Sequence, residues 1–100
     1  MTNHVAEIVT FKLAPNVSTQ DFVALSQKSE AFCRQNPGFR HRQLSCGDDG
    51  TWTDYVIWSD MDTAKSVTEA FPQQAFAPAL FAAIAPDTVT MRHEIVHWAI

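Results

Sequence analysis

The segment RHEIVHW at positions 92–98 contains the spacing H-E-x-x-H, defined by His93, Glu94 and His97. On a helix this spacing places two imidazoles on one face, where both can bind one zinc ion. On a strand the two histidines also share a face, but they stand about 13 Å apart, at roughly 3.3 Å per residue. Because zinc holds each nitrogen at about 2.0–2.1 Å, two such histidines cannot share an ion.

The residues around this segment favour a strand. From position 87 to 98 the sequence is rich in β-branched residues, and it alternates so that Met91, His93 and Ile95 fall on one face while Arg92 and Glu94 fall on the other. We therefore expect the zinc-peptidase spacing to be a coincidence within a C-terminal strand. No metal site is predicted.

Composition limits the class of protein. The chain has 100 residues, which is the size of one domain, here predicted to span 1–100. Apolar residues make up 46% and charged residues 18%, as in a globular protein, and the net charge is −4 without any basic block. Binding to nucleic acid is not expected, because it needs clustered Lys and Arg. No apolar run is long enough to span a membrane.

The start of the chain has no signal-peptide pattern, so a cytoplasmic location is expected. Cys33 and Cys46 lack metal-site spacing and are expected to be small buried thiols in a reducing compartment. The chain has three glycines and no phosphate-binding glycine loop. No cofactor is therefore predicted, and flavin and nicotinamide are disfavoured.

Hydrophobic periodicity and turn residues give the element order β-α-β-β-α-(α)-β. Strands are predicted over 4–13, 39–46, 52–59 and 87–98. A first helix is predicted from a capping box at Ser18 to the stop at 36–38, a second from Ser59 or Asp60 to Pro72, and a short third piece over 73–84. This order predicts an α+β ferredoxin-like sandwich, with a four-stranded antiparallel sheet and helices on one face. The open face is expected to form a homodimer.

Four segments carry a resemblance to a known family: EIVTFKL at 7–13, NPGF at 36–39, DGTWTDYVIW at 49–58 and VTMRH at 89–93. With these segments the chain resembles the antibiotic-biosynthesis-monooxygenase-like members of the dimeric α+β barrel superfamily. The resemblance implies the same fold and a dimer. The superfamily includes cofactor-independent oxygenases of polycyclic aromatics, haem-degrading enzymes and isomerases, so the fold alone does not assign a reaction.

The haem-degrading members use an Asn on the first strand, a Trp on the sheet and a His on the second helix that ligates iron. This chain offers Trp58 for the tryptophan, but its first strand has Glu7 and Thr10 in place of an internal Asn. Neither helical segment after Trp58 contains a His. Haem degradation is therefore disfavoured.

Two residues could carry proton transfer. His93 is predicted mid-strand among apolar neighbours, where an imidazole can act as a general base near neutral pH. Glu7 lies mid-strand on the first strand, which neighbours the last strand in this fold, so Glu7 could approach His93 or Arg92 and orient the imidazole. The alternatives are a structural histidine with satisfied nitrogens and a buried or edge ion pair at Glu7.

Other residues could bind a ligand. Trp52 and Trp58 are predicted on one face of the third strand and Tyr55 on the other, and aromatic walls suit a flat apolar molecule. Arg42 could bind an anionic substrate group. The alternatives are core or dimer packing for the aromatic residues and, for Arg42, solvation or pairing with an acid such as Asp54.

Three functions remain open from the sequence. The first is a cofactor-independent monooxygenase acting on a small aromatic or polyketide-like molecule, with His93 as the base. The second is a non-catalytic ligand-binding or stress-associated dimer in which His93 and Glu7 are structural. The third is an isomerase-like enzyme that uses the same histidine without oxygen.

Overall fold

The computed structural model of the chain describes residues 3–100. The strands are β1 (Val5–Phe11), β2 (Phe39–Cys46), β3 (Trp52–Trp58) and β4 (Thr90–Ile95). The helices are α1 (Thr19–Gln27), α2 (Glu30–Gln35), α3 (Met61–Ala70) and α4 (Ala77–Ala82), with short 3-10 turns at Phe71–Gln73 and Pro86–Thr88. The predicted order of strands and helices is confirmed.

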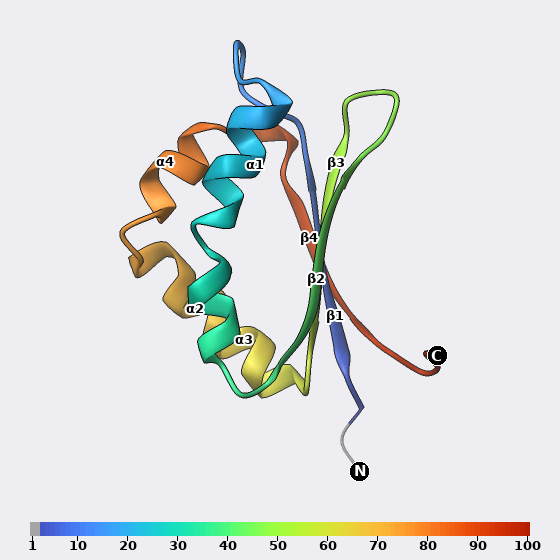
Figure 1. The fold of residues 1–100 in the computed structure, drawn as a ribbon. Helices are drawn as coiled ribbons and strands as arrows, with labels where there is room; N and C mark the ends of the chain where they lie inside the picture. The colour runs from blue at the N-terminus through green and yellow to red at the C-terminus, as the bar shows by residue number, and fades with distance from the viewer. Residues whose placement is uncertain (1–2) are drawn as a thin grey trace.

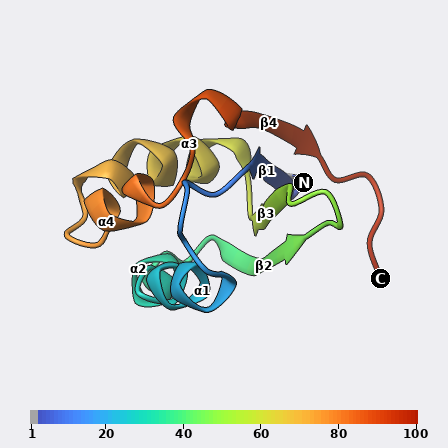
Figure 2. The same cartoon turned by 90° about the horizontal axis from the view of Figure 1, so that it is seen from above.

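The four strands form one antiparallel sheet in the order β2-β3-β1-β4. All helices cover one face of this sheet, and the other face is open (Figure 1). Seen from above, α1 and α2 lie over the β2 side while α3 and α4 lie over the β1 and β4 side (Figure 2). This is the ferredoxin-like arrangement expected from the sequence.

The first helical region begins where the sequence places it but is divided in two. Ser18 caps α1 by accepting a hydrogen bond from the backbone N–H of Asp21 at 3.0 Å. The prediction of a single helix up to 36–38 is wrong, because the helix is interrupted between Gln27 and Glu30. At the break, the fully buried Ser29 hydroxyl donates to the carbonyl oxygen of Ser26 at 2.6 Å, which is the kind of side-chain bond that competes with helix continuation.

The second helical region also differs in length from the prediction. Asp60, one of two predicted caps, starts α3 by accepting from the N–H of Thr63 at 2.7 Å. Pro72 falls in the 3-10 turn that follows, as a helix-ending residue should. The third piece, predicted over 73–84, is helical only over Ala77–Ala82, with Pro78 in its first turn.

Strand β4 is shorter than the predicted strand over 87–98. Its first residues are replaced by the 3-10 turn at Pro86–Thr88, and it ends at Ile95. His93 therefore lies on a strand, and His97 lies beyond the strand end. Because neither histidine is on a helix, RHEIVHW lacks the geometry that gives H-E-x-x-H its zinc chemistry.

The core fills the space between sheet and helices in two clusters. One surrounds Trp58, and the other surrounds Phe22, which makes edge-to-face contacts with Phe11 and Trp52 at 5.4 and 5.1 Å between ring centroids. Cys33 is buried as predicted, but Cys46 is exposed because it ends edge strand β2. Within residues 3–100, none of the helices has the length and apolar character needed to cross a membrane.

Candidate functional site

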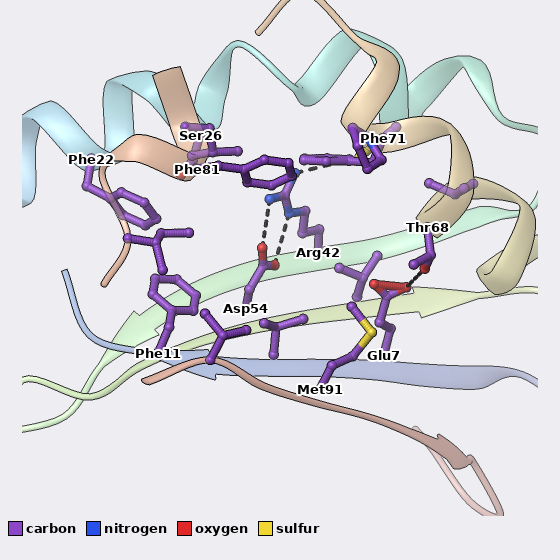
Figure 3. Close-up of a pocket in the computed structure, with 18 of the residues that line it drawn as sticks. Glu7, Phe11, Phe22, Ser26, Arg42, Asp54, Thr68, Phe71, Phe81 and Met91 are labelled. Atoms are coloured by element: carbon purple, nitrogen blue, oxygen red, sulfur yellow. Dashed lines mark hydrogen bonds and ion pairs between the residues drawn. The ribbon is translucent and has the colours of Figure 1, made fainter. Parts of the chain in front are cut away.

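A cavity of about 400 Å³ lies between the helices and the sheet. It is mostly apolar, as Figure 3 shows, with side chains from the sheet below and from the helices above. The sheet contributes Val9, Val56 and Met91, and the helical layer contributes Phe71, Leu80 and Phe81. The two rings of Phe71 and Phe81 stand 5.9 Å apart between centroids with an interplanar angle of 34°, so they form one aromatic wall. Such a cavity has the size and surface for a flat apolar molecule.

The cavity opens on the side of α4 and β4. Phe81, Val89 and Met91 line it, yet they are 46%, 44% and 48% exposed. Large apolar side chains left in solvent at the edge of a cavity provide an entry surface for an apolar ligand.

Glu7 is the acid that faces this cavity from the central strand β1 (Figure 3). Its Oε1 accepts a hydrogen bond from the indole N–H of Trp58 at 3.2 Å. The hydroxyl of Thr68, on α3, lies 3.2 Å from the same oxygen and 2.9 Å from the carbonyl oxygen of Ala64. Within residues 3–100, Oε2 of Glu7 has no hydrogen-bond partner. One oxygen of the carboxyl group is therefore held in place, and the other is available to a ligand.

The contacts of Thr68 bear on the protonation of Glu7. A hydroxyl has one proton to donate, so Thr68 cannot donate to both oxygens at once. Thr68 therefore donates either to Oε1 of Glu7 or to the carbonyl oxygen of Ala64. Burial raises the pKa of Glu7 above its usual value, since desolvation outweighs the hydrogen bond from Trp58 and the other lowering contacts. Such a carboxyl group can exchange a proton closer to neutral pH.

His93 stands directly opposite Glu7 in the pairing of β1 with β4. Its Nε2 is 3.7 Å from Oε1 of Glu7, beyond hydrogen-bonding distance, and this buried nitrogen has no hydrogen-bond partner in the part of the chain that the structure describes. The expected approach of Glu7 to the last strand is therefore present, toward His93, while Arg92 pairs with Glu94 on the other face. Glu7 lines the cavity, and His93 lies behind it.

Arg42 and Asp54 form a two-pronged ion pair that also lines the cavity (Figure 3). Nε of Arg42 donates to Oδ1 of Asp54 at 3.0 Å, and an Nη donates to Oδ2 at 2.8 Å. The second Nη donates to the Ser29 hydroxyl at 2.6 Å and approaches the Cys33 sulfur at 3.6 Å. Burial alone would lower the pKa of Arg42, but its contacts with Asp54 raise it above its usual value. For the buried Cys33 thiol, desolvation acts in the opposite direction and raises the pKa.

The aromatic residues predicted to bind a ligand lie in three different places. Trp58 lines the cavity, where its indole holds Glu7. Trp52 is buried against Phe22 and does not reach the cavity lining. Tyr55 falls on the open face of the sheet, because it alternates with the inward residues of β3, and it is half-buried there.

Sequence reasoning did not include Thr68, Phe71 or Phe81 among the site residues. Thr68 follows Ala64 by four residues and precedes Phe71 by three, so helical spacing places it on the inward face of α3. That signal was present in the sequence. No comparable signal places Phe81, because α4 is too short to show a clear apolar face.

No metal site emerges from these side chains: residues 3–100 contain no group of three or more His, Cys, Asp and Glu placed to hold an ion. The charged lining groups are Glu7, Arg42 and Asp54, and two of these three are paired with each other. The arrangement can bind a flat molecule and exchange a proton with it at Glu7.

Comparison with known proteins supports the fold. No family model matches the chain, and no curated protein matches its sequence. Solved structures do match over nearly the whole length. A variant of SnoaB, a cofactor-independent oxygenase from Streptomyces nogalater, superposes with a TM-score of 0.79 at 18% identity, covering 99% of this chain and 98% of that one.

Two further structures show how widely the fold is used. A Bordetella bronchiseptica protein named for the antibiotic biosynthesis monooxygenases matches with a TM-score of 0.76 at 17% identity, over 97% of this chain and 100% of that one. A hydroxynitrile lyase from Passiflora edulis matches with a TM-score of 0.73 at 13% identity, over 100% and 99%. The resemblance to the antibiotic-biosynthesis-monooxygenase fold is thereby confirmed, and at these identities it extends to the fold alone.

Proposed function

We propose that this protein is a cofactor-independent oxygenase that binds a flat phenolic molecule in the cavity and removes its hydroxyl proton with Glu7. The observation that carries the proposal is the free Oε2 of Glu7, a buried acid that faces an otherwise apolar cavity. The fold match to a cofactor-independent oxygenase supports the same reaction class.

The walls of the cavity, Glu7 and His93 have separate roles in this proposal. The aromatic wall of Phe71 and Phe81 and the aliphatic floor at Val56 hold the ring flat. Glu7, rather than His93, touches the substrate, because Glu7 lines the cavity. His93 is a positioning residue whose charge, when it is protonated, stabilises the Glu7 carboxylate across 3.7 Å.

The chemistry needs only the substrate and dioxygen. A phenol gives its proton to Oε2 of Glu7 and becomes a phenolate. The phenolate adds O2 at a ring carbon, and Glu7 returns the proton to the distal oxygen to give a hydroperoxide. The ring carbon then loses its hydrogen as a proton while the hydroperoxide loses hydroxide. The two combine as water, and a quinone remains. One oxygen atom enters the product and the other leaves as water, so four electrons pass from the ring to O2. The mostly apolar lining favours the oxidation, because it offers competing water few groups to bind.

Glu7→Gln tests this assignment, because it keeps the shape of the side chain and removes the base. With hydroxynaphthalenes as probes and an oxygen electrode as the assay, we expect O2 uptake by the wild type and a loss of at least about 100-fold in Glu7→Gln. Binding of the probe should change little. The matched control is Glu30→Gln, which alters an exposed acid on α2 and should leave turnover unchanged.

Two other outcomes would select the alternatives. Tight probe binding with no chemical change in the wild type would favour a non-catalytic ligand-binding protein. Conversion without O2 uptake would favour an isomerase-like or lyase-like enzyme, which is a candidate because Glu7 and His93 can move protons without oxygen. The fold match to a hydroxynitrile lyase supports this second alternative.

We also propose that two copies pair through the open sheet face. That face carries Ile8, Tyr55 and Ile57, and the chain beyond β4 runs away from the sheet with Trp98 78% exposed (Figures 1 and 2). Ile8 is only 6% exposed and Tyr55 and Ile57 are half-buried, so Trp98 is the exposed apolar group whose burial would favour association. Native mass spectrometry of gently purified protein should give twice the mass of one chain, and a monomer at micromolar concentration would contradict the pairing.

A further inference from the structure

The ion pair of Arg42 and Asp54 determines what the cavity can offer to a charged ligand. The two side chains are 17% and 19% exposed, so solvent screens them little. Both oxygens of Asp54 accept hydrogen bonds from Arg42, and the remaining Nη donates to Ser29. The guanidinium group thus has a partner at each of its three nitrogens. Asp54 stands where the carboxylate of an anionic ligand would have to bind.

The charges that line the cavity sum to zero or to −1. Arg42 and Asp54 cancel each other, and Glu7 adds a negative charge only when it is ionised. An anion that entered would lose its water without meeting an unpaired cation, which carries a large desolvation cost. An uncharged ring with a hydroxyl group avoids this cost and can still reach Oε2 of Glu7.

We infer that Asp54 sets the charge selectivity of the cavity, which therefore accepts uncharged flat ligands and rejects the same ring bearing a carboxylate. This inference rests on the proposed function in that it takes the cavity to be the ligand site. It reassigns Arg42, which the sequence suggested as a group for binding an anion. In this role Asp54 is a specificity-determining residue that acts through Arg42 rather than on the reacting atoms.

The test uses three probes that share a naphthalene ring: 2-naphthol, 2-naphthoate and 2-naphthylmethylammonium. Dissociation constants are measured by isothermal titration calorimetry at pH 7. The wild type should bind 2-naphthol at least about tenfold more tightly than 2-naphthoate, a difference of roughly 1.4 kcal/mol. Asp54→Asn leaves Arg42 without its counter-charge, so 2-naphthoate should gain at least about tenfold while 2-naphthol changes less than about threefold.

Glu30→Gln is the matched control. Glu30 pairs with Arg34 on α2 at 3.0 Å, and both side chains are more than 60% exposed. This variant makes the same change in net charge and also frees an arginine, but it does so on the surface. It should leave all three dissociation constants unchanged, so a gain in 2-naphthoate binding here would assign the effect to net charge and overturn the inference.

The remaining outcomes are also decisive. Equal binding of 2-naphthol and 2-naphthoate to the wild type would overturn the inference while leaving the cavity as the ligand site. Binding of no probe by the folded wild type would contradict the proposed function itself, and the inference with it. If circular dichroism shows that Asp54→Asn is unfolded, Arg42→Gln replaces it. That variant leaves Asp54 uncompensated and should bind the ammonium probe at least about tenfold more tightly; an unchanged affinity would refute the role of the pair.

Discussion

Replacing Trp58 by phenylalanine removes the hydrogen bond that holds Glu7 and little else that is polar. The indole N–H donates to Oε1 of Glu7 at 3.2 Å, and the ring is 2% exposed and packs edge-to-face on Phe39 at 5.8 Å. Trp58→Phe keeps an aromatic ring against Phe39 but leaves a small void. The void should cost about 1–2 kcal/mol at any pH, less than the 3–5 kcal/mol of truncation to alanine.

The lost hydrogen bond should cost an amount that depends on pH. A hydrogen bond to a neutral carboxyl group stabilises the fold by about 0.5–1.5 kcal/mol, and one to a charged group by about 1.5–3 kcal/mol. Burial raises the pKa of Glu7 in the folded protein, so the wild type loses stability as pH rises from the unfolded value of about 4.3 through the folded one. Trp58→Phe removes a contact that lowers this pKa, so the loss should become larger and extend to higher pH.

Urea unfolding at pH 4 and pH 8, followed by far-ultraviolet circular dichroism, measures this difference. We expect Trp58→Phe to destabilise the protein by about 1 kcal/mol more at pH 8 than at pH 4. Trp52→Phe is the control, because Trp52 is also buried on β3 while its indole N–H makes no hydrogen bond within residues 3–100. Other titrating groups affect both variants alike. If the two variants show the same pH dependence, Glu7 does not depend on Trp58 and the reasoning is refuted.

Two further substitutions test how the fold supports the site. In Gly38→Ala the new Cβ would lie 2.6 Å from Cγ2 of Thr63, so overpacking should lower the free energy of unfolding by about 1–3 kcal/mol; an unchanged urea midpoint would show that α3 yields freely. Ser29→Ala leaves a buried nitrogen of Arg42 with only the weak sulfur acceptor of Cys33 and should cost about 1–3 kcal/mol. The control Ser66→Ala, on the exposed face of α3, should cost less than about 0.5 kcal/mol. Equal effects of the two serine substitutions would contradict the role assigned to Ser29.

The order of elements was predictable because it rests on local patterns. The caps at Ser18 and Asp60 and the turn between β2 and β3 are all set by residues close together in the sequence. The break at Ser29 was not predictable in the same way. The Ser29 hydroxyl at the break also accepts a hydrogen bond from Arg42, which lies 13 positions away on β2 and reaches Ser29 only after the sheet and helices have packed.

In the site, too, local sequence patterns predict some features, while others depend on tertiary packing. The pairing of β1 with β4 follows from the fold, so the sequence was enough to predict that Glu7 approaches the last strand, at His93 or Arg92. Whether Glu7 or His93 faces the cavity was not predictable, since both point toward the helices. The difference arises because β1 is central and β4 is an edge strand, so Glu7 lies beneath α3 while His93 lies at the side of the sheet.

The placement of Glu7 also explains why the fold alone leaves the reaction open. The ferredoxin-like frame supplies an apolar space between helices and sheet, and any inward position of β1 or β3 can present one polar group to it. In this chain two acids occupy such positions, but Asp54 is neutralised by Arg42 whereas Glu7 keeps an oxygen free. The chemistry of the cavity therefore depends on which acid has a cation beside it, and exchanging the partners of these two acids should change the reaction without changing the fold.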